Sequence, residues 1–262
     1  MQDLSDAYEN RAYIPGGDEY PPRWMAQAAA FRDAHDVQEL SGFHTGTRRA
    51  VDMVTPGGAA EGTVIFVHGG YWRAFDKSVW THLAAGAVQC GWRVALPGYT
   101  LCPEVRIRDI TRQIAEAVAA VARATDGPIT LTGHSAGGHL VARMLAPGML
   151  SDDVLERITR VAPISMLSDL RPLLQTAMNA DLRLDAEEAE EESPLLQPRP
   201  DTEVALWVGA EERPAFLDQS RWLSEAWGVP QHILPGRHHF DVIEPMEDAQ
   251  SGLVRFLTGH AA

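Results

Sequence analysis

One short segment of the sequence carries the residue types of a nucleophilic serine site. Gly133-His134-Ser135-Ala136-Gly137-Gly138 follows the apolar run 129–132, and a helical apolar pattern begins directly after it. A serine on a sharp turn between a strand and a helix is lifted above the sheet, and glycines beside it tolerate strained backbone and close helix–strand contact. Such a serine forms a covalent acyl intermediate once a base takes its proton. The pattern therefore predicts Ser135 as the nucleophile of an acyl-transfer reaction.

Two histidines, His134 and His139, stand beside this serine in the chain. The base that activates Ser135 must reach it from a different loop, because residues next to such a turn point elsewhere. We therefore expect both histidines to support the turn, and we expect the base to come from later in the chain.

A second glycine-containing segment, His68-Gly69-Gly70-Tyr71-Trp72, directly follows an apolar run. It has the place and character of a loop whose backbone N–H groups stabilise the negative charge on the carbonyl oxygen during acyl transfer. We expect the N–H groups of Gly70, Tyr71 and Ala136 to be these donors. Tyr71 and Trp72 are also candidate substrate-binding residues, able to stack on an aryl ring, with a place in the core as the alternative.

The base should follow both the serine and the acid in chain order. His232 lies inside a strand-like run and His260 lies near the end of the sequence, whereas the loop 235–239 follows the last strand-like run. The base is therefore His238 or His239. Paired histidines can also bind a metal, but no third ligand has a suitable spacing, so no metal site is predicted.

The orienting carboxylate belongs in the loop after the penultimate strand-like run, which ends in Gly209-Ala210-Glu211-Glu212. A carboxylate in this loop accepts the imidazole N–H, fixes the tautomer and stabilises the imidazolium that forms. Glu212 is preferred because it lies three residues after Gly209, and Glu211 remains the alternative.

The elements that must position these residues alternate regularly along the chain. Apolar, β-branched runs are each followed by a helical pattern, which is typical of βα units on a mainly parallel sheet covered on both faces. Isoleucines and valines spaced by three or four residues over 107–121 predict one helix that packs on this sheet. Together with the serine turn, the pattern predicts an α/β-hydrolase fold, with a mostly parallel central sheet flanked by helices. The strand-like runs are residues 63–67, 92–96, 129–132, 158–161, 204–208 and 231–234.

Two segments interrupt this alternation. One is an N-terminal arm, residues 1–45, and the other is the stretch 168–200, which is too long for an ordinary connection. We expect the second to be a small cap-like insertion over the substrate. Neither a repeat nor a linker divides the chain, so residues 1–262 are predicted to form a single domain.

The composition excludes several classes of function. A formal net charge of −14 argues against nucleic-acid or anionic-membrane partners, because phosphate binding needs clustered Lys and Arg. No run of about 18 apolar residues could span a bilayer, and the start lacks the pattern of a signal peptide. We therefore expect a cytoplasmic protein with a small-molecule substrate. The oligomeric state is open, with a homodimer as one option.

Cysteines and the acidic run are expected to be structural. Cys90 and Cys102 are the only cysteines, too few for a disulfide scaffold, and are expected to be core residues. The acidic run 187–192 is expected to be a solvated helix face.

With these residues in view, the sequence resembles the kynurenine formamidase (arylformamidase) family of α/β-hydrolases. Four segments carry the resemblance: Tyr8-Glu9-Asn10-Arg11-Ala12, residues 68–72, residues 133–138, and His239-Phe240-Asp241-Val242-Ile243-Glu244. The insertion is also similar to that of the family, from Ser168-Asp169-Leu170-Arg171-Pro172-Leu173 to Glu192-Ser193-Pro194-Leu195. The resemblance thus spans nearly the whole chain.

The resemblance implies roles for individual residues. The family's catalytic histidine directly precedes Phe-Asp, which carries over to His239, and its acid precedes a Ser-Pro-Glu-Phe-like stretch, which matches Glu212. This chain departs from the family pattern at two positions, with Glu212 in place of Asp and Ala215 in place of Glu.

The activity implied by the resemblance is hydrolysis of N-formyl-L-kynurenine to L-kynurenine and formate, a step of tryptophan catabolism, without a cofactor. A broad carboxylesterase or thioesterase with the same Ser135, His239 and Glu212 is the first alternative. A binding module on a hydrolase scaffold is the second, because fold does not dictate function.

Overall fold

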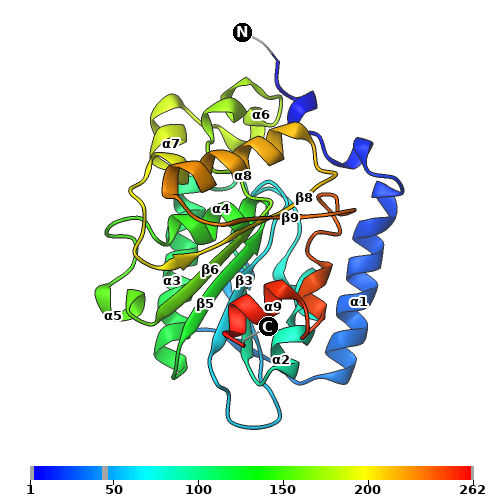
Figure 1. The fold of residues 1–262 in the computed structure, drawn as a ribbon, viewed down its shortest axis with the longest axis vertical. Helices are drawn as coiled ribbons and strands as arrows, with labels where there is room; N and C mark the ends of the chain where they lie inside the picture. Colours follow the sequence, from blue (N-terminus) through cyan, green and yellow to red (C-terminus); the bar gives the residue numbers. More distant parts are fainter. Residues whose placement is uncertain (1–2, 43–46, 261–262) are drawn as a thin grey trace.

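A sheet of nine strands runs through the middle of the computed structural model, which describes residues 3–42 and 47–260 (Figure 1). Eight of the strands follow the order β1-β2-β4-β3-β5-β6-β8-β9, and the short β7 pairs with β6. The strands are β1 (Val37–Leu40), β2 (Val51–Val54), β3 (Thr63–Val67), β4 (Arg93–Pro97), β5 (Ile129–His134), β6 (Ile158–Ile164), β7 (Glu203–Val204), β8 (Leu206–Gly209) and β9 (Gln231–Leu234).

Strands β3 to β9 are parallel and coincide with the predicted apolar runs, whereas β1 and β2 were not predicted. β1 pairs with β2, and β2 with β4, both antiparallel. Gln38, Glu39 and Asp52 interrupt the apolar pattern of these two strands. Part of the predicted N-terminal arm is therefore an edge of the sheet.

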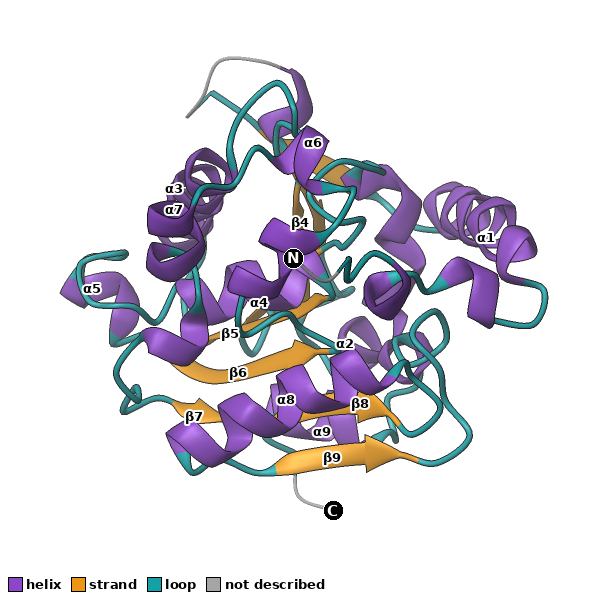
Figure 2. Cartoon of the chain, turned by 90° about the horizontal axis from the view of Figure 1, so that it is seen from above, coloured by secondary structure: helices purple, strands orange, loops and turns teal. Residues whose placement is uncertain are grey.

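Helices cover both faces of the sheet (Figure 2). On one face, α1, α2 and α9 pack in a core around Val64, Phe66 and Val94; on the other, α3, α4 and α8 pack in a core around Ile65, Val67 and Leu131. The helices are α1 (Tyr20–Ala34), α2 (Ala85–Gln89), α3 (Ile107–Ala124), α4 (Ala136–Arg143), α5 (Asp152–Leu155), α6 (Asn179–Leu182), α7 (Ala186–Glu191), α8 (Pro214–Trp227) and α9 (Gly252–Thr258).

The segment before α1 and the insertion 168–200 meet above the carboxyl ends of the strands (Figure 1). The Leu4 N–H donates to the Gln175 carbonyl at 2.8 Å. Gln219 on α8 joins the two segments, because its Nε2 donates to the Tyr8 hydroxyl at 3.0 Å and its Oε1 accepts from the Ser168 N–H at 2.7 Å. These contacts place the N-terminal residues over the end of the sheet where the predicted catalytic residues lie.

The acidic run is only partly a solvated face, so that prediction was wrong for two of its residues. Glu188 and Glu192 are buried, and they lie four residues apart on the inner edge of the insertion. Glu188 pairs with Arg106, and Glu192 accepts from Arg143 Nε at 3.2 Å and from the Thr111 hydroxyl at 2.6 Å. These paired carboxylates attach the insertion to α3 and α4, since a buried charge needs a partner.

The two cysteines are free thiols, with Cys102 buried and Cys90 half-buried against the core. Across residues 3–42 and 47–260, no helix combines the length and the apolar character needed to cross a bilayer.

Candidate active site

Ser135 occupies a strained turn between β5 and α4. Its φ of 55° and ψ of −118° lie in a region that residues other than glycine rarely adopt. A Cβ added to Gly137 would lie 1.9 Å from the Val67 carbonyl oxygen, so only glycine lets α4 approach β3 this closely. The Ser135 N–H donates to the Ile164 carbonyl at 2.8 Å, which fixes the turn against β6. The serine is thereby presented at the floor of a cavity.

His239 and Glu212 form a buried pair beside this serine. His239 Nδ1 lies 2.7 Å from Glu212 Oε2, which places the N–H on Nδ1 and leaves Nε2 free to accept a proton. His239 and Ser135 line the same cavity. Within the described residues the Ser135 hydroxyl has no hydrogen-bond partner; such contacts tighten when substrate binds. The three residues predicted from the sequence are thus brought together.

The second oxygen of Glu212 is also held. Glu212 Oε1 accepts from the Gly209 N–H at 2.9 Å and from the Ser165 hydroxyl. Ser165 itself has a φ of 49°, which turns the chain just after β6. Sequence reasoning missed Ser165, because nothing in its local pattern signals that it bonds a residue 47 positions away.

The alternatives Glu211 and His238 lie outside this arrangement. Glu211 is exposed, whereas His238 contacts the Tyr20 hydroxyl at 3.0 Å and Asp241 Oδ1 at 3.1 Å. Among the residues that the structure describes, no three or more His, Cys, Asp or Glu side chains gather as metal ligands would. The two neighbouring histidines therefore have different roles. His238 connects helix α1 to the loop that carries His239.

Glu212→Gln is expected to lower kcat by about 10³-fold or more, because the amide keeps the size of the side chain but loses the charge that stabilises the imidazolium of His239. Glu211→Gln is the matched control and should change kcat less than threefold. The kcat of both purified variants on one ester substrate measures the difference. Equal losses would remove Glu212 as the acid.

The loop after β3 has the geometry of an oxyanion site. Gly70, Tyr71 and Trp72 have φ values of 109°, 51° and 57°, and the Gly70 carbonyl accepts from the N–H groups of Arg73 and Ala74, both at 3.0 Å. A Cβ on Gly69 would lie 3.1 Å from Ser135 Cβ, so the loop runs directly beside the nucleophile.

Three backbone donors are free at this loop. In the described part of the chain the N–H groups of Gly70, Tyr71 and Ala136 donate to no acceptor. Unpaired N–H groups next to a nucleophile are able to bind a developing oxyanion.

His134 and His139 are both buried supports of the turn. Burial lowers the pKa of His134 well below its usual value, so the ring is neutral, and its Nε2 lies 2.8 Å from the His239 carbonyl. Burial also lowers the pKa of His139 to about 3, and its Nε2 lies 2.7 Å from the Glu192 carbonyl. His134 thus links the serine turn to the His239 loop, and His139 links α4 to the insertion.

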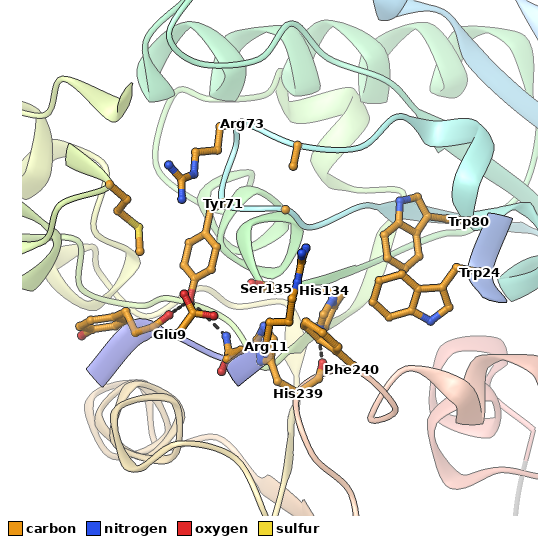
Figure 3. A pocket seen from close by; sticks show the side chains of 15 residues that line it. Glu9, Arg11, Trp24, Tyr71, Arg73, Trp80, His134, Ser135, His239 and Phe240 are labelled. Carbon is orange, nitrogen blue, oxygen red and sulfur yellow. Dashed lines mark hydrogen bonds between the residues drawn. The ribbon is translucent and has the colours of Figure 1, made fainter. Parts of the chain in front are cut away.

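Ser135 opens onto a cavity of about 420 Å³ (Figure 3). Most of its wall comes from three segments. They are the N-terminal segment (residues 3–19), the loop 68–74 after β3, called the oxyanion loop, and the loop 235–240 that carries His239. Two kinds of side chain meet there: an aromatic group from Trp24, Trp80 and Phe240, and a polar group around Tyr71. The lining residues are Tyr8, Glu9, Asn10, Arg11, Trp24, Gly70, Tyr71, Arg73, Ala74, Trp80, His134, Ser135, Met178, His239 and Phe240.

Tyr71 lines this cavity, but Trp72 does not. The Tyr71 hydroxyl accepts from Asn10 Nδ2 at 3.1 Å and donates to the Tyr8 carbonyl. Trp72 is fully buried, with its ring edge-on to His139 at 5.1 Å. The substrate-binding role expected for Trp72 is therefore corrected to a core role.

The aromatic wall was missed from the sequence. Trp24 on α1 packs against Trp80 at 4.8 Å and against Phe240 at 5.3 Å between ring centroids. Trp24, Ala28 and Phe31 have helical spacing and are buried, which by itself indicates only a core-facing helix. Nothing local shows that this helix docks beside a loop more than 200 residues away; the bond between Tyr20 and His238 spans 218 residues.

Comparisons with known proteins agree with this geometry. Residues 64–213 match a family model described as alpha/beta hydrolase fold. The chain is 29% identical over 214 residues to the kynurenine formamidase of Drosophila melanogaster, covering 74% of this chain and 71% of that protein. It is 28% identical over 271 residues to the kynurenine formamidase of Danio rerio, covering 90% and 92%.

Solved structures give the same picture of the fold. A Silicibacter protein that carries the provisional description of a thioesterase is 53% identical, with a TM-score of 0.96, over 98% of this chain and 100% of that chain. An esterase of Pyrobaculum calidifontis is 16% identical with a TM-score of 0.72 over 97% and 96% of the two chains, a likeness of fold alone.

Proposed function

Because the chain belongs to the α/β-hydrolase family and is a hydrolase, we propose that it cleaves aryl formamides, with N-formyl-L-kynurenine as its substrate. The observation that carries this proposal is the cavity, in which an aromatic wall stands beside a buried Glu212–His239 pair and the strained Ser135. The similarity to kynurenine formamidases supports the same substrate.

The reaction proceeds in two acyl-transfer steps. His239 Nε2 takes the proton of the Ser135 hydroxyl as its oxygen attacks the formyl carbon, and the N–H groups of Gly70, Tyr71 and Ala136 stabilise the oxyanion. The imidazolium then gives this proton to the leaving aryl nitrogen, so the C–N bond breaks and formyl-serine remains. His239 then takes a proton from water, which attacks the carbonyl carbon of that ester; the imidazolium gives the proton to the Ser135 oxygen as its bond to carbon breaks, and formate leaves with the serine regenerated. Glu212 stays ionised throughout and stabilises the imidazolium.

The cavity suits this substrate class for two physical reasons. A formyl group carries only hydrogen on its carbonyl carbon, so nearly all the space of the cavity is available to the leaving group. Trp24, Trp80 and Phe240 offer ring faces and edges to an arene, and such contacts contribute about 0.5–1.5 kcal/mol beyond the burial of area. Tyr71, with its hydroxyl fixed by Asn10, closes the other side.

A carboxylesterase or thioesterase activity is the second candidate, favoured by the description of the Silicibacter relative. The same triad would serve it, because both reactions pass through an acyl-serine. The two candidates differ in the acyl group. A thioesterase of long chains needs cavity space beside the carbonyl carbon for the acyl chain, whereas a formyl group needs none there.

A substrate panel tests the proposal. The kcat/KM of the purified protein is expected to be higher for N-formyl-L-kynurenine than for 4-nitrophenyl acetate, 4-nitrophenyl decanoate, acetyl-CoA and decanoyl-CoA, with little activity on acyl groups larger than acetyl. A tenfold advantage of a long acyl chain or a thioester, about 1.4 kcal/mol in transition-state binding, would overturn it in favour of the second candidate.

A further inference from the structure

Three charged side chains line the cavity, although most of its wall is aromatic or neutral. Glu9 and Arg11 come from the N-terminal segment, and Arg73 comes from the turn that follows the oxyanion loop. None of these three residues belongs to the triad or to the aromatic wall. Two of the three are guanidinium groups, which bring positive charge to the cavity in a chain with a net charge of −14.

Glu9 is an acceptor without a partner. Glu9 is exposed, and in the part of the chain that the structure describes no ion pair or hydrogen bond engages its carboxylate, which lies beside the tip of the Tyr71 ring (Figure 3). Burial raises the pKa of Tyr71 well above its usual value, and the charge of Glu9 adds to this. An ammonium group entering the cavity would find this carboxylate unneutralised.

The position of Glu9 is fixed by its neighbours. The Tyr8 carbonyl accepts from the Tyr71 hydroxyl, and Asn10 Nδ2 donates to the same hydroxyl at 3.1 Å. The residues on both sides of Glu9 are therefore bound to one phenol in the cavity wall. Such preorganisation lowers the entropy lost on binding.

Arg11 is held only weakly by the protein. Its guanidinium lies 3.6 Å from Asp18, whose side chain is 89% exposed, and an exposed pair of this kind contributes little to stability. Arg11 also forms no ion pair with Glu9, two residues away. In Figure 3 its side chain extends between Tyr71 and Phe240, toward the middle of the cavity. A planar guanidinium there is suited to bind a carboxylate through two parallel hydrogen bonds.

Arg73 adds a second positive charge but is already oriented, because its guanidinium lies 2.6 Å from Asp181 in the insertion. The Asp181 carboxylate offsets the charge of Arg73, and the ion pair joins the oxyanion loop to α6.

From these contacts we infer that Arg11 and Glu9 recognise the dipolar α-amino-acid end of the substrate: Arg11 binds the carboxylate, and Glu9 binds the ammonium group. The inference rests on the proposed function, because it concerns the same cavity. The substrate carries a carboxylate and an ammonium group on one carbon. Arg11 and Glu9, from a single short segment, offer the complementary guanidinium and carboxylate. A neutral aryl ester or a fatty acyl chain has no use for this pair.

A pair of substrates isolates the effect. N-formyl-L-kynurenine and 2-formamidoacetophenone share the arene, the ketone and the formamide, and only the first has the amino-acid end. The wild type is expected to prefer the first in kcat/KM. Arg11→Met and Glu9→Gln should each lower the ratio of the two kcat/KM values at least tenfold, mainly through KM for N-formyl-L-kynurenine.

Matched controls come from outside the cavity. Arg112 is exposed on α3 and lies 3.6 Å from Asp109, as Arg11 does from Asp18, and Glu187 is an exposed carboxylate on α7. Arg112→Met and Glu187→Gln should leave the ratio unchanged. A ratio that is also unchanged in Arg11→Met and Glu9→Gln would overturn the inference.

An inhibition experiment separates this inference from the proposed reaction. L-kynurenine and 2-aminoacetophenone are compared as competitive inhibitors of 4-nitrophenyl acetate hydrolysis, a readout that needs no formamide turnover. Stronger inhibition by L-kynurenine, lost in Arg11→Met, supports the inference even if formamides are not cleaved. Equal inhibition by both compounds overturns it, while formamide turnover would still stand.

Discussion

Ser135→Ala is expected to lower kcat by about 10⁴-fold or more on every substrate the protein hydrolyses, because the serine, histidine and acid act as a unit and only binding and the oxyanion donors remain. The thermal unfolding midpoint should change little, because the substitution removes only a hydroxyl that faces the cavity and donates to no described residue. The measurement is steady-state kcat with N-formyl-L-kynurenine and with 4-nitrophenyl acetate, alongside a thermal melt.

Ser220→Ala is the matched control for this variant. Ser220 is also buried, and its hydroxyl likewise lacks a partner among the described residues. It should keep near-wild-type kcat. If Ser135→Ala retained a tenth of the activity while folded, another nucleophile would have to be sought.

His239→Ala should be nearly as inactive as Ser135→Ala, with kcat lower by about 10⁴-fold, because both proton transfers of the reaction pass through its Nε2. His238→Ala should lose less than about tenfold, since it removes contacts to Tyr20, Asp241 and the Phe240 N–H that place the loop, but His238 itself takes no part in proton transfer. The kcat of the two variants on one substrate decides the matter, with circular dichroism to check folding. If His238→Ala had the lower kcat of the two variants, the base would be His238.

The parts of the molecule that follow from short sequence segments were predictable. The α/β-hydrolase fold and the hydrolase class, both predicted, are confirmed by the family match and by the relatives. Ser135 lies in a local strand–turn–helix pattern, and Glu212 lies three residues after the glycine that ends β8. In each case the residue follows closely after a strand that the sequence predicts, so its place in the fold can be inferred from the local pattern.

The parts that depend on tertiary contacts were not predictable. Trp72 was a candidate for the substrate wall or for the core, and its buried ring beside His139 assigns it to the core. Glu188 and Glu192 were expected to be solvated, because their partners, Arg106 before α3 and Arg143 on α4, are distant in the sequence. Trp24 reaches the cavity because α1 packs against Phe240, and Glu9 reaches it because its neighbours Tyr8 and Asn10 bond the Tyr71 hydroxyl.

The dependence of the cavity on the N-terminal segment has a consequence for engineering. The turn that carries Ser135 tolerates few changes, because a Cβ on Gly69, Gly133 or Gly137 would meet neighbouring atoms at 3.1 Å or less. Glu9 and Arg11 line the same cavity but are exposed, and exposed positions tolerate more substitutions. Substrate specificity can therefore be altered at these two positions while the turn that carries Ser135 is left unchanged.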